Sequence, residues 1–308
     1  MPLKIFFLHY DLGTGEIYLI CLTDAAIHAI DYAIVNGAKI INSSWGLYND
    51  PPGLLSAISR AQQNGILFIA SAGNDSSNND AHSEYPASYD LDNIISVLMT
   101  DYNDKKSERS NYGMYSVDLG APGGSDSSQS AYNILSTAKE DGDYRYLYHA
   151  GTSMAAPLVA GLAALVWGQR PYLDWWQVKT ILARSVDVIP DLQNVTRYGG
   201  RINAYNALTY STPILPDPPS GLRSFVYKRD DGWYDIKLTW TDNSDNEEGF
   251  IIYRNSGNAF WEIDRVSPNT TEYWDYELPR GYYYYYIRAF NQDGESVKTP
   301  QVAAKAMG

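Results

Sequence analysis

Apolar residues along the first two thirds of the chain recur at helical spacing and at strand spacing in turn. Three isoleucines at helical spacing mark a helix over residues 25–36, and an apolar strand follows at 39–42. The same order returns with a helix over 54–64 and a strand over 66–69. Repeated helix–strand units of this kind predict an α/β domain, in which a parallel sheet is flanked by helices.

The two ends of this region also carry apolar patterns. Residues 1–8 form a short apolar run that predicts a buried strand, and 13–23 would then lead to the first helix. Apolar residues at helical spacing over 175–182 predict a last amphipathic helix, and a glycine-rich closing element follows at 199–204. The α/β domain is therefore expected to span residues 1–212.

A change of pattern after a proline-rich stretch predicts a second domain. Four prolines lie in the linker at 213–219, a composition that gives a stiff, extended link. Beyond it, residues 235–240 alternate with period two, and further strands are expected at 249–254 and 282–290. Short strands without helices between them predict an all-β sandwich over 220–308.

Composition and charge exclude several function classes. The formal net charge of −13 argues against a nucleic-acid partner, which would need a basic face. The single cysteine, Cys21, allows no intramolecular disulfide and is expected to be a small buried residue. No apolar run is long enough to predict a membrane span, and Met1 is not followed by the charged segment and cleavage site of a signal peptide.

The most informative motif places a serine at the start of a helix. Residues 151–157, of sequence GTSMAAP, precede a run of small and apolar residues at 158–166 that predicts a helix. The start of a helix presents unpaired backbone N–H groups and a partial positive charge, which would stabilise an oxyanion formed beside Ser153. A structural alternative is an N-cap serine that opens an alanine-rich core helix.

Residues 151–157 resemble the nucleophile motif of the subtilisin family of serine peptidases. The resemblance implies that Ser153 attacks the peptide carbonyl, and that the fold is the family's parallel sheet with flanking helices. Ser44, Trp45 and Gly46 follow the first helix–strand unit and resemble the family segment that hydrogen-bonds an extended substrate backbone as an added strand. The protein is therefore expected to be a serine endopeptidase that acts on protein or peptide substrates.

Ala72, Gly73 and Asn74 follow the second helix–strand unit, and Asn74 matches the asparagine of the family's oxyanion hole. An amide donates a hydrogen bond without titrating, and loss of such a donor lowers turnover about 10²- to 10³-fold, a magnitude known from subtilisin itself. Taken alone, a Gly-Asn pair after a strand is also ordinary turn chemistry. Its place between the motifs of Ser44 and Ser153 favours the oxyanion role.

Tyr85, Pro86 and Ala87 resemble the family loop that shapes the primary specificity pocket. Glu84, directly before this loop, would then lie near the base of the pocket, where a carboxylate would tolerate a basic substrate side chain. The simpler interpretation of Glu84 is a solvated acid in a loop. That Glu84 binds a substrate side chain is therefore a hypothesis.

The resemblance also implies a catalytic acid and a catalytic base that precede the serine in the chain. In the family the acid stands in an Asp-x-Gly strand end and the base in a His-Gly-Thr-His helix. We expect neither motif before Ser44 in this chain, so that both residues would lie before residue 1. Among His9, His28, His82 and His149, only His149, four residues before Ser153, is a candidate replacement base. We therefore expect an N-terminally truncated peptidase that is nearly inactive alone. The alternative is a non-catalytic pseudopeptidase that binds peptides or serves in adhesion.

The second domain resembles a fibronectin type III domain in its opening at 218–222, its Trp240 strand and its tyrosine-rich strand ending at 288–291. Trp240 is expected to be the core tryptophan of this domain. Alternate rings of the tyrosine run at 282–286 would point outward and offer a surface for carbohydrate or protein. Packing of the run into the core and one face is the simpler interpretation.

No cofactor and no metal-binding residues are identified in the sequence. Asp242, Asp245, Glu247 and Glu248 are close together, and a solvated turn is a simpler interpretation of them than a metal loop. The family resemblance implies structural calcium without naming its ligands, and it implies an extracellular, secreted protein.

Overall fold

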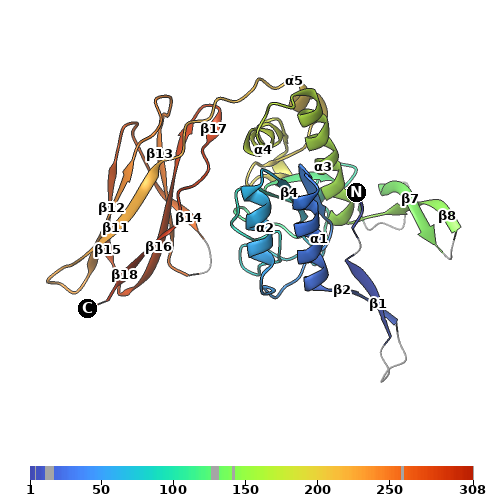
Figure 1. Ribbon diagram of the computed structural model, residues 1–308, viewed down its shortest axis with the longest axis horizontal. Coiled ribbons are helices and arrows are strands. Elements are labelled where there is room, and N and C mark those ends of the chain that lie inside the picture. The colour runs from blue at the N-terminus through green and yellow to red at the C-terminus, as the bar shows by residue number, and fades with distance from the viewer. Residues whose placement is uncertain (4, 11–16, 126–131, 141–142, 258–259, 308) are drawn as a thin grey trace. The chain divides into compact units, whose positions relative to one another are not determined.

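The computed structural model describes residues 1–308 except 4, 11–16, 126–131, 141–142, 258–259 and 308. For residues 6–10, 17–21 and 139–140 it describes the backbone alone. The chain divides into two compact units, Met1–Tyr210 and Ser211–Gly308 (Figure 1). Each unit has its own apolar core and is described by itself.

The first unit is built around a six-stranded sheet. In spatial order its strands are β3 (Ile40–Ser43), β4 (Leu67–Ser71), β5 (Ile94–Thr100), β6 (Leu119–Pro122), β10 (Gly200–Arg201) and β9 (Asp187–Val188). Neighbours from β3 to β10 pair in parallel, and β9 pairs antiparallel with β10. β4 and β5 are buried along their whole length, which is typical of parallel strands that are covered on both faces.

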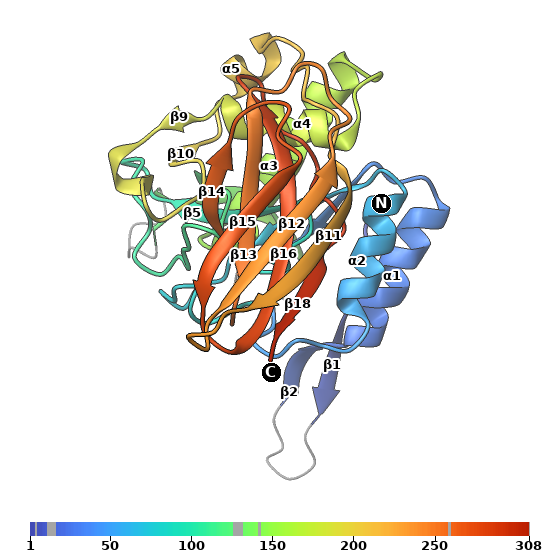
Figure 2. The same ribbon diagram turned by 90° about the vertical axis from the view of Figure 1, so that its left-hand side faces the viewer.

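Helices cover both faces of this sheet. The α-helices of the described part are α1 (Thr23–Val35), α2 (Leu54–Gln63), α3 (Thr152–Gln169), α4 (Trp175–Arg184) and α5 (Ala204–Thr209), and a short 3-10 helix spans Pro190–Leu192. α1 and α2 lie side by side, joined by an ion pair of Arg60 with Asp31 at 2.7 Å (Figures 1 and 2). Phe68 of β4 belongs to the apolar cluster of α1 and α2, whereas its neighbour Leu67 belongs to the cluster of α3 and α4. The two clusters are separate because successive side chains of a strand point to opposite faces.

The helix ends follow local sequence signals. α1 and α2 end just before Gly37 and Gly65, which have φ of 71° and 73° and so take the left-handed conformation that glycine adopts without strain. Asp174 and Gln177 form a capping box at the start of α4. The predicted helices over 25–36 and 54–64 are confirmed to within two residues at each end.

The amino-terminal segment differs from the prediction of a buried strand over residues 1–8. β1 (Phe6–Tyr10) pairs antiparallel with β2 (Ile17–Cys21) in a separate two-stranded sheet, and neither strand joins the six-stranded sheet. The prediction was wrong in position and pairing. β2 is the next strand along the chain, and pairing β1 with a strand so close in the sequence costs little loop-closure entropy. The expected burial of Cys21 concerns a side chain outside the described residues.

α3 corrects the expectation that no apolar run could span a membrane. Among the helices of the described residues it is the one that is long and apolar enough by length and composition, with 18 residues and a mean hydropathy of 1.2. It packs on β3, β4, β5 and β6, and Val159, Leu162 and Val166 are buried there. The buried face of this helix thus forms part of the core beneath the sheet.

The second unit consists of two antiparallel sheets that share one core, visible as two layers of strands in Figure 1. One sheet holds β11 (Ser220–Lys228), β12 (Tyr234–Thr241) and β15 (Glu272–Leu278); the other holds β14 (Trp261–Val266), β13 (Gly249–Asn255), β16 (Gly281–Asn291) and β17 (Gly294–Glu295), with β18 (Val302–Ala306) on β16. Ile236 of β12 packs with Ile252 of β13. Trp240 is 5% exposed, and its ring meets Phe250 edge-on at 5.6 Å. The unit is therefore a β-sandwich.

The tyrosine run on β16 alternates only in part. Tyr283 and Tyr285 are buried in the core between the sheets, and Tyr282 and Tyr284 are exposed. Tyr286 should be exposed by this alternation, but it is buried. It stacks on a neighbouring strand's tyrosine at 4.6 Å, so packing on the outer face of the sheet overrides the simple pattern there.

Candidate active site

Ser153 lies in the first turn of α3 and contacts a loop that is distant in the sequence. Its hydroxyl donates to the Ser44 carbonyl at 3.1 Å, and the Ser44 hydroxyl donates to the Ser153 carbonyl at 3.0 Å. Ser44 directly follows β3, so the reciprocal pair joins the start of the helix to the carboxyl end of a parallel strand. Ligand sites in open α/β sheets lie at this edge.

Pro157 explains why the Ser153 carbonyl is available to Ser44. In a regular α-helix the N–H of residue 157 would donate to the carbonyl of residue 153, but proline has no N–H. The vacant acceptor takes the Ser44 hydroxyl instead. The small-residue motif therefore does more than begin a helix, since its proline keeps one carbonyl free for a contact between segments.

Asn74 is held beside the same helix turn with one end of its amide free. Its Oδ1 accepts from the Thr152 backbone N–H at 2.9 Å and from the Thr152 hydroxyl at 3.2 Å. The Gly73 N–H donates in turn to the Thr152 hydroxyl oxygen at 3.2 Å. Because Oδ1 is occupied, the Nδ2 group is the end left to donate, and it has no hydrogen-bond acceptor among the described residues.

Glu84 is buried between the two segments that approach α3. Reciprocal backbone hydrogen bonds of 2.7 Å between Leu47 and Tyr85 hold its loop beside the segment that contains Gly46. Glu84 is only 7% exposed, so the interpretation as a solvated loop acid is wrong. Asn111 Nδ2 donates to its Oε2 at 2.8 Å. The sequence could not reveal this burial, because the partners come from three distant segments.

The environment of Glu84 disfavours its charged form. Burial, with the nearby negative charge of Asp75, raises the pKa of Glu84 from 4.5 to about 7, although hydrogen bonds from Tyr48 and Asn111 oppose the shift. Burial and a hydrogen bond to Asp75 raise the pKa of Tyr48 to about 12, so this phenol stays neutral at physiological pH.

Gly46 and Gly73 are required by the Glu84 carboxyl group. A Cβ at Gly46 would lie 2.0 Å from Oε1, and a Cβ at Gly73 would lie 1.8 Å from Oε2. Gly73 also has a φ of 108°, which other residues adopt only with strain. The carboxyl group thus touches both backbone segments at once.

Two predicted substrate-binding residues point their side chains elsewhere. Trp45 packs against the apolar cluster of α1 and α2, and Ala72 is fully buried with Leu98 and Val117. Only the backbone of these two residues lies along the segments that approach Ser153. The alternation of an extended segment accounts for this, because neighbours of Ser44 and Gly73 face the opposite side.

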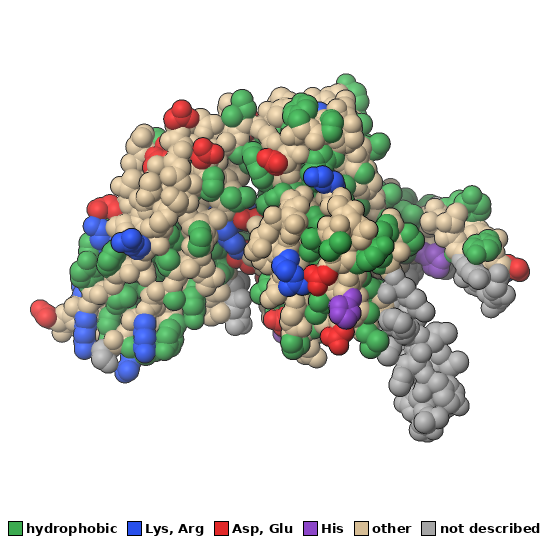
Figure 3. Space-filling view, viewed as in Figure 1, with side chains coloured by type: hydrophobic (Ala, Val, Ile, Leu, Met, Phe, Trp, Pro, Cys, Tyr) green, Lys and Arg blue, Asp and Glu red, His purple; other side chains and the backbone are tan. Residues whose placement is uncertain are grey.

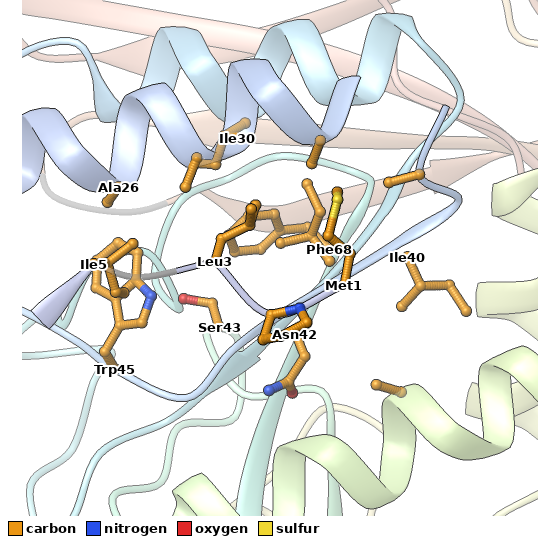
Figure 4. Close-up of a pocket in the computed structure, with 16 residues that line it drawn as sticks. Met1, Leu3, Ile5, Ala26, Ile30, Ile40, Asn42, Ser43, Trp45 and Phe68 are labelled. Atoms are coloured by element: carbon orange, nitrogen blue, oxygen red, sulfur yellow. The ribbon is translucent and has the colours of Figure 1, made fainter. Parts of the chain in front are cut away.

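An apolar cavity of about 500 Å³ lies on that opposite side, beside β3 (Figure 4). Leu3, Ile30 and Phe68 line it together with Trp45. In the described part of the chain β3 is the edge strand of the six-stranded sheet and pairs with β4 alone. The Ser43 hydroxyl at this edge is buried and has no hydrogen-bond partner in the described part of the chain. The edge of β3 is therefore apolar and incompletely satisfied.

No histidine side chain of the described residues bonds to Ser153. His28 on α1 and His82 in a loop are exposed, and so is His149 at the end of β8 (Asp143–His149), which forms a hairpin with β7 (Ile134–Glu140) before α3. Figure 3 shows the histidines of this face at the molecular surface. The side chain of His9 lies outside the described residues. The Ser153 hydroxyl therefore faces a carbonyl rather than an imidazole.

The expectation that no Asp-x-Gly precedes Ser44 is wrong as far as the spelling of the sequence goes. Asp11, Leu12 and Gly13 follow β1 and have the spelling Asp-x-Gly. These three residues lie outside the described residues. The strand before them, β1, pairs with β2 and does not lie beside β3 in the six-stranded sheet. Residues 1–308, taken over their described part, also contain no cluster of three or more His, Cys, Asp or Glu side chains that could hold a metal ion.

Comparison with known proteins gives a consistent picture. The sequence profile of the subtilase family matches residues 20–207. The chain is 38% identical over 190 residues to a thermophilic serine proteinase of Bacillus sp. (strain AK1). The alignment covers 61% of this chain and 42% of that protein. It is 36% identical over 186 residues to thermitase of Thermoactinomyces vulgaris, covering 60% of each. The chain thus spans less than two thirds of the length of these relatives.

Solved structures also resemble part of the chain. A protease of Pseudoalteromonas arctica PAMC 21717 superposes with a TM-score of 0.56 at 28% identity, over 61% of this chain and 58% of that one. The prenylagaramide maturation protease PagA superposes with a TM-score of 0.51 at 30% identity, over 61% of this chain and 68% of that one.

Proposed function

Because this chain belongs to the subtilase family of peptidases, we propose that it contributes the nucleophile and the oxyanion hole of a serine endopeptidase. The observation that carries the proposal is the convergence of Ser153, Ser44 and Asn74 at the first turn of α3. Ser153 Oγ is the proposed nucleophile towards a peptide carbonyl. The carbonyl oxygen then gains negative charge, which Asn74 Nδ2 and the free N–H groups of the helix start stabilise.

The serine proton needs a base that the described residues do not place at Ser153. A peptide carbonyl such as that of Ser44 is far too weak a base for this transfer, and loss of the base or nucleophile of a triad costs on the order of 10⁶ in turnover. The proposed acid and base therefore belong to a segment that completes the sheet at the edge of β3. The cavity there and the unpaired Ser43 hydroxyl support this proposal, since an edge strand readily accepts another strand.

The proposed substrate is an extended polypeptide that pairs with the backbone at Ser44–Gly46. Residues 1–212 form the proposed peptidase domain, 213–219 the linker and 220–308 a fibronectin type III-like domain. We propose this second domain as a module that binds carbohydrate or protein, in an extracellular protein of the secreted type. Structural calcium is part of the proposal by family likeness alone.

A second candidate function is a pseudopeptidase that binds peptides without cleaving them. The hydrogen bond of the Ser153 hydroxyl to the Ser44 carbonyl favours it, because the described residues then give the serine no activating base. The two functions differ in whether bound peptide is turned over.

The test expresses residues 1–308 together with all sequence encoded in frame before Met1, and treats the product with diisopropyl fluorophosphate. Mass spectrometry should find the adduct on Ser153, protein that was not treated with the inhibitor should hydrolyse casein, and Ser153→Ala should abolish both. Asn74→Ala should lower turnover about 10²- to 10³-fold and leave the adduct. Peptide binding with neither adduct nor hydrolysis would identify the pseudopeptidase.

A further inference from the structure

Glu84 carries a buried carboxyl group for which the described residues supply no counter-charge. No lysine, arginine or histidine of the described residues lies within ion-pair distance of it. The groups that face it are the Asn111 amide, the Tyr48 phenol and the Asp75 carboxylate, and the last of these adds negative charge. A buried charge without a partner is costly, and such groups are enriched at functional sites.

The carboxyl group lies beside the proposed active site rather than in a remote part of the core. It touches the α-carbon regions of Gly46 and Gly73. Gly46 lies two residues after Ser44, which bonds to Ser153. The Gly73 N–H bonds to Thr152, the residue before the nucleophile. A substrate side chain that enters between these two segments would therefore meet the carboxyl oxygens.

We propose that the Glu84 carboxylate binds the ammonium or guanidinium group of a lysine or arginine side chain in the substrate. This inference rests on the proposed function, because it assigns a substrate class to the same site. A cationic head would supply the missing counter-charge and could donate to both carboxyl oxygens. An apolar side chain would only bury the carboxylate further, at a cost in desolvation.

The proposal entails a dependence on pH. The pKa of Glu84 is about 7, so the carboxylate is ionised at pH 8 and largely protonated at pH 6. A cation should therefore bind more weakly as the pH falls through 7. Asp75 and Tyr48 are the other titratable groups that face Glu84, and Asp75 raises its pKa by charge. Asp75→Asn should consequently extend cation binding to lower pH.

The test titrates the full 308-residue chain with benzamidine, a planar cation, and with benzamide, its neutral isostere, by isothermal calorimetry at pH 6 and pH 8. We expect benzamidine to bind at pH 8 in clear preference to benzamide, and to lose affinity at pH 6. Glu84→Gln should weaken benzamidine binding about 10- to 100-fold at pH 8. Glu108→Gln, which removes an exposed acid of the same unit, serves as the matched control and should change nothing.

Three outcomes would overturn or support the inference independently of catalysis. Equal binding of the two ligands, or benzamidine binding that Glu84→Gln leaves intact, would overturn it. Retained binding in Glu84→Asp, which keeps the charge, would support it and show that the glutamine variant did not act through misfolding. Benzamidine binding requires no chemistry at Ser153. Its persistence alongside a failed adduct test would therefore overturn the proposed endopeptidase and leave the cation site standing.

Discussion

Replacement of Glu84 by glutamine measures how much the buried carboxylate lowers the free energy of unfolding. Its pKa rises from an ordinary 4.5 to about 7 on folding. An acid with a raised pKa in the native chain holds its proton more tightly there, so the free energy of unfolding falls as the pH rises from about 4.5 to 7. The difference between the two values corresponds to about 3 kcal/mol of destabilisation, absent below about pH 4 and fully present above about pH 7.

Glutamine has nearly the same shape as glutamic acid and can accept the hydrogen bond from Asn111 without becoming charged. The Glu84→Gln variant should therefore exceed the wild type in stability by up to about 3 kcal/mol at pH 8, and match it near pH 4.5. Differential scanning calorimetry at the two pH values measures this difference, and only the transition of the first unit should move. The control Glu108→Gln should give the same small difference at both pH values. A difference for Glu84→Gln that does not grow with pH would refute the assignment of a charged, uncompensated carboxylate.

Two further substitutions test the packing of the site. Gly73→Ala places a Cβ 1.8 Å from Glu84 Oε2 at a φ of 108°, so it should destabilise the first unit by more than about 2 kcal/mol, and Glu84→Ala in the same chain should recover part of the loss in thermal unfolding. An unchanged melting temperature for Gly73→Ala would contradict the described contact. Ser44→Ala removes the donor to the Ser153 carbonyl and should cost about 1 kcal/mol. In the double variant, Pro157→Ala supplies a helix N–H to that carbonyl and should restore the free energy of unfolding measured in urea. If the two substitutions instead lower the stability additively, the carbonyl does not need a partner.

Local patterns were sufficient to predict four of the helices and some of the strands of the described part. The helix over 25–36 and the alternating strand over 235–240 occur as α1 and β12, because helix and strand periodicity depends on residues two to four positions apart. The motif at 151–157 identified the nucleophile candidate and its helix for the same reason, since the signal is contained in neighbouring residues. The prediction for residues 1–8 failed because an apolar run does not say which strand it pairs with, and here β1 pairs with β2.

The arrangement of the candidate site could be predicted only in outline. The order of the parallel strands brings Ser44, Asn74 and Ser153 to one edge, which follows from the alternation of helices and strands. The sequence alone could not show that Pro157 frees the Ser153 carbonyl for Ser44, because the donor comes from a segment 109 residues away.

The sequence by itself determined the family, the two-part organisation and the residue types available for chemistry, all of which depend on motifs and periodicities along the chain. The tertiary structure alone decided that Glu84 is buried, that its pKa is about 7, and that Gly46 and Gly73 leave room for its carboxyl group. The physical reason is that burial and electrostatic environment are set by every neighbour in space. For Glu84 those neighbours come from segments that only the folded chain brings together.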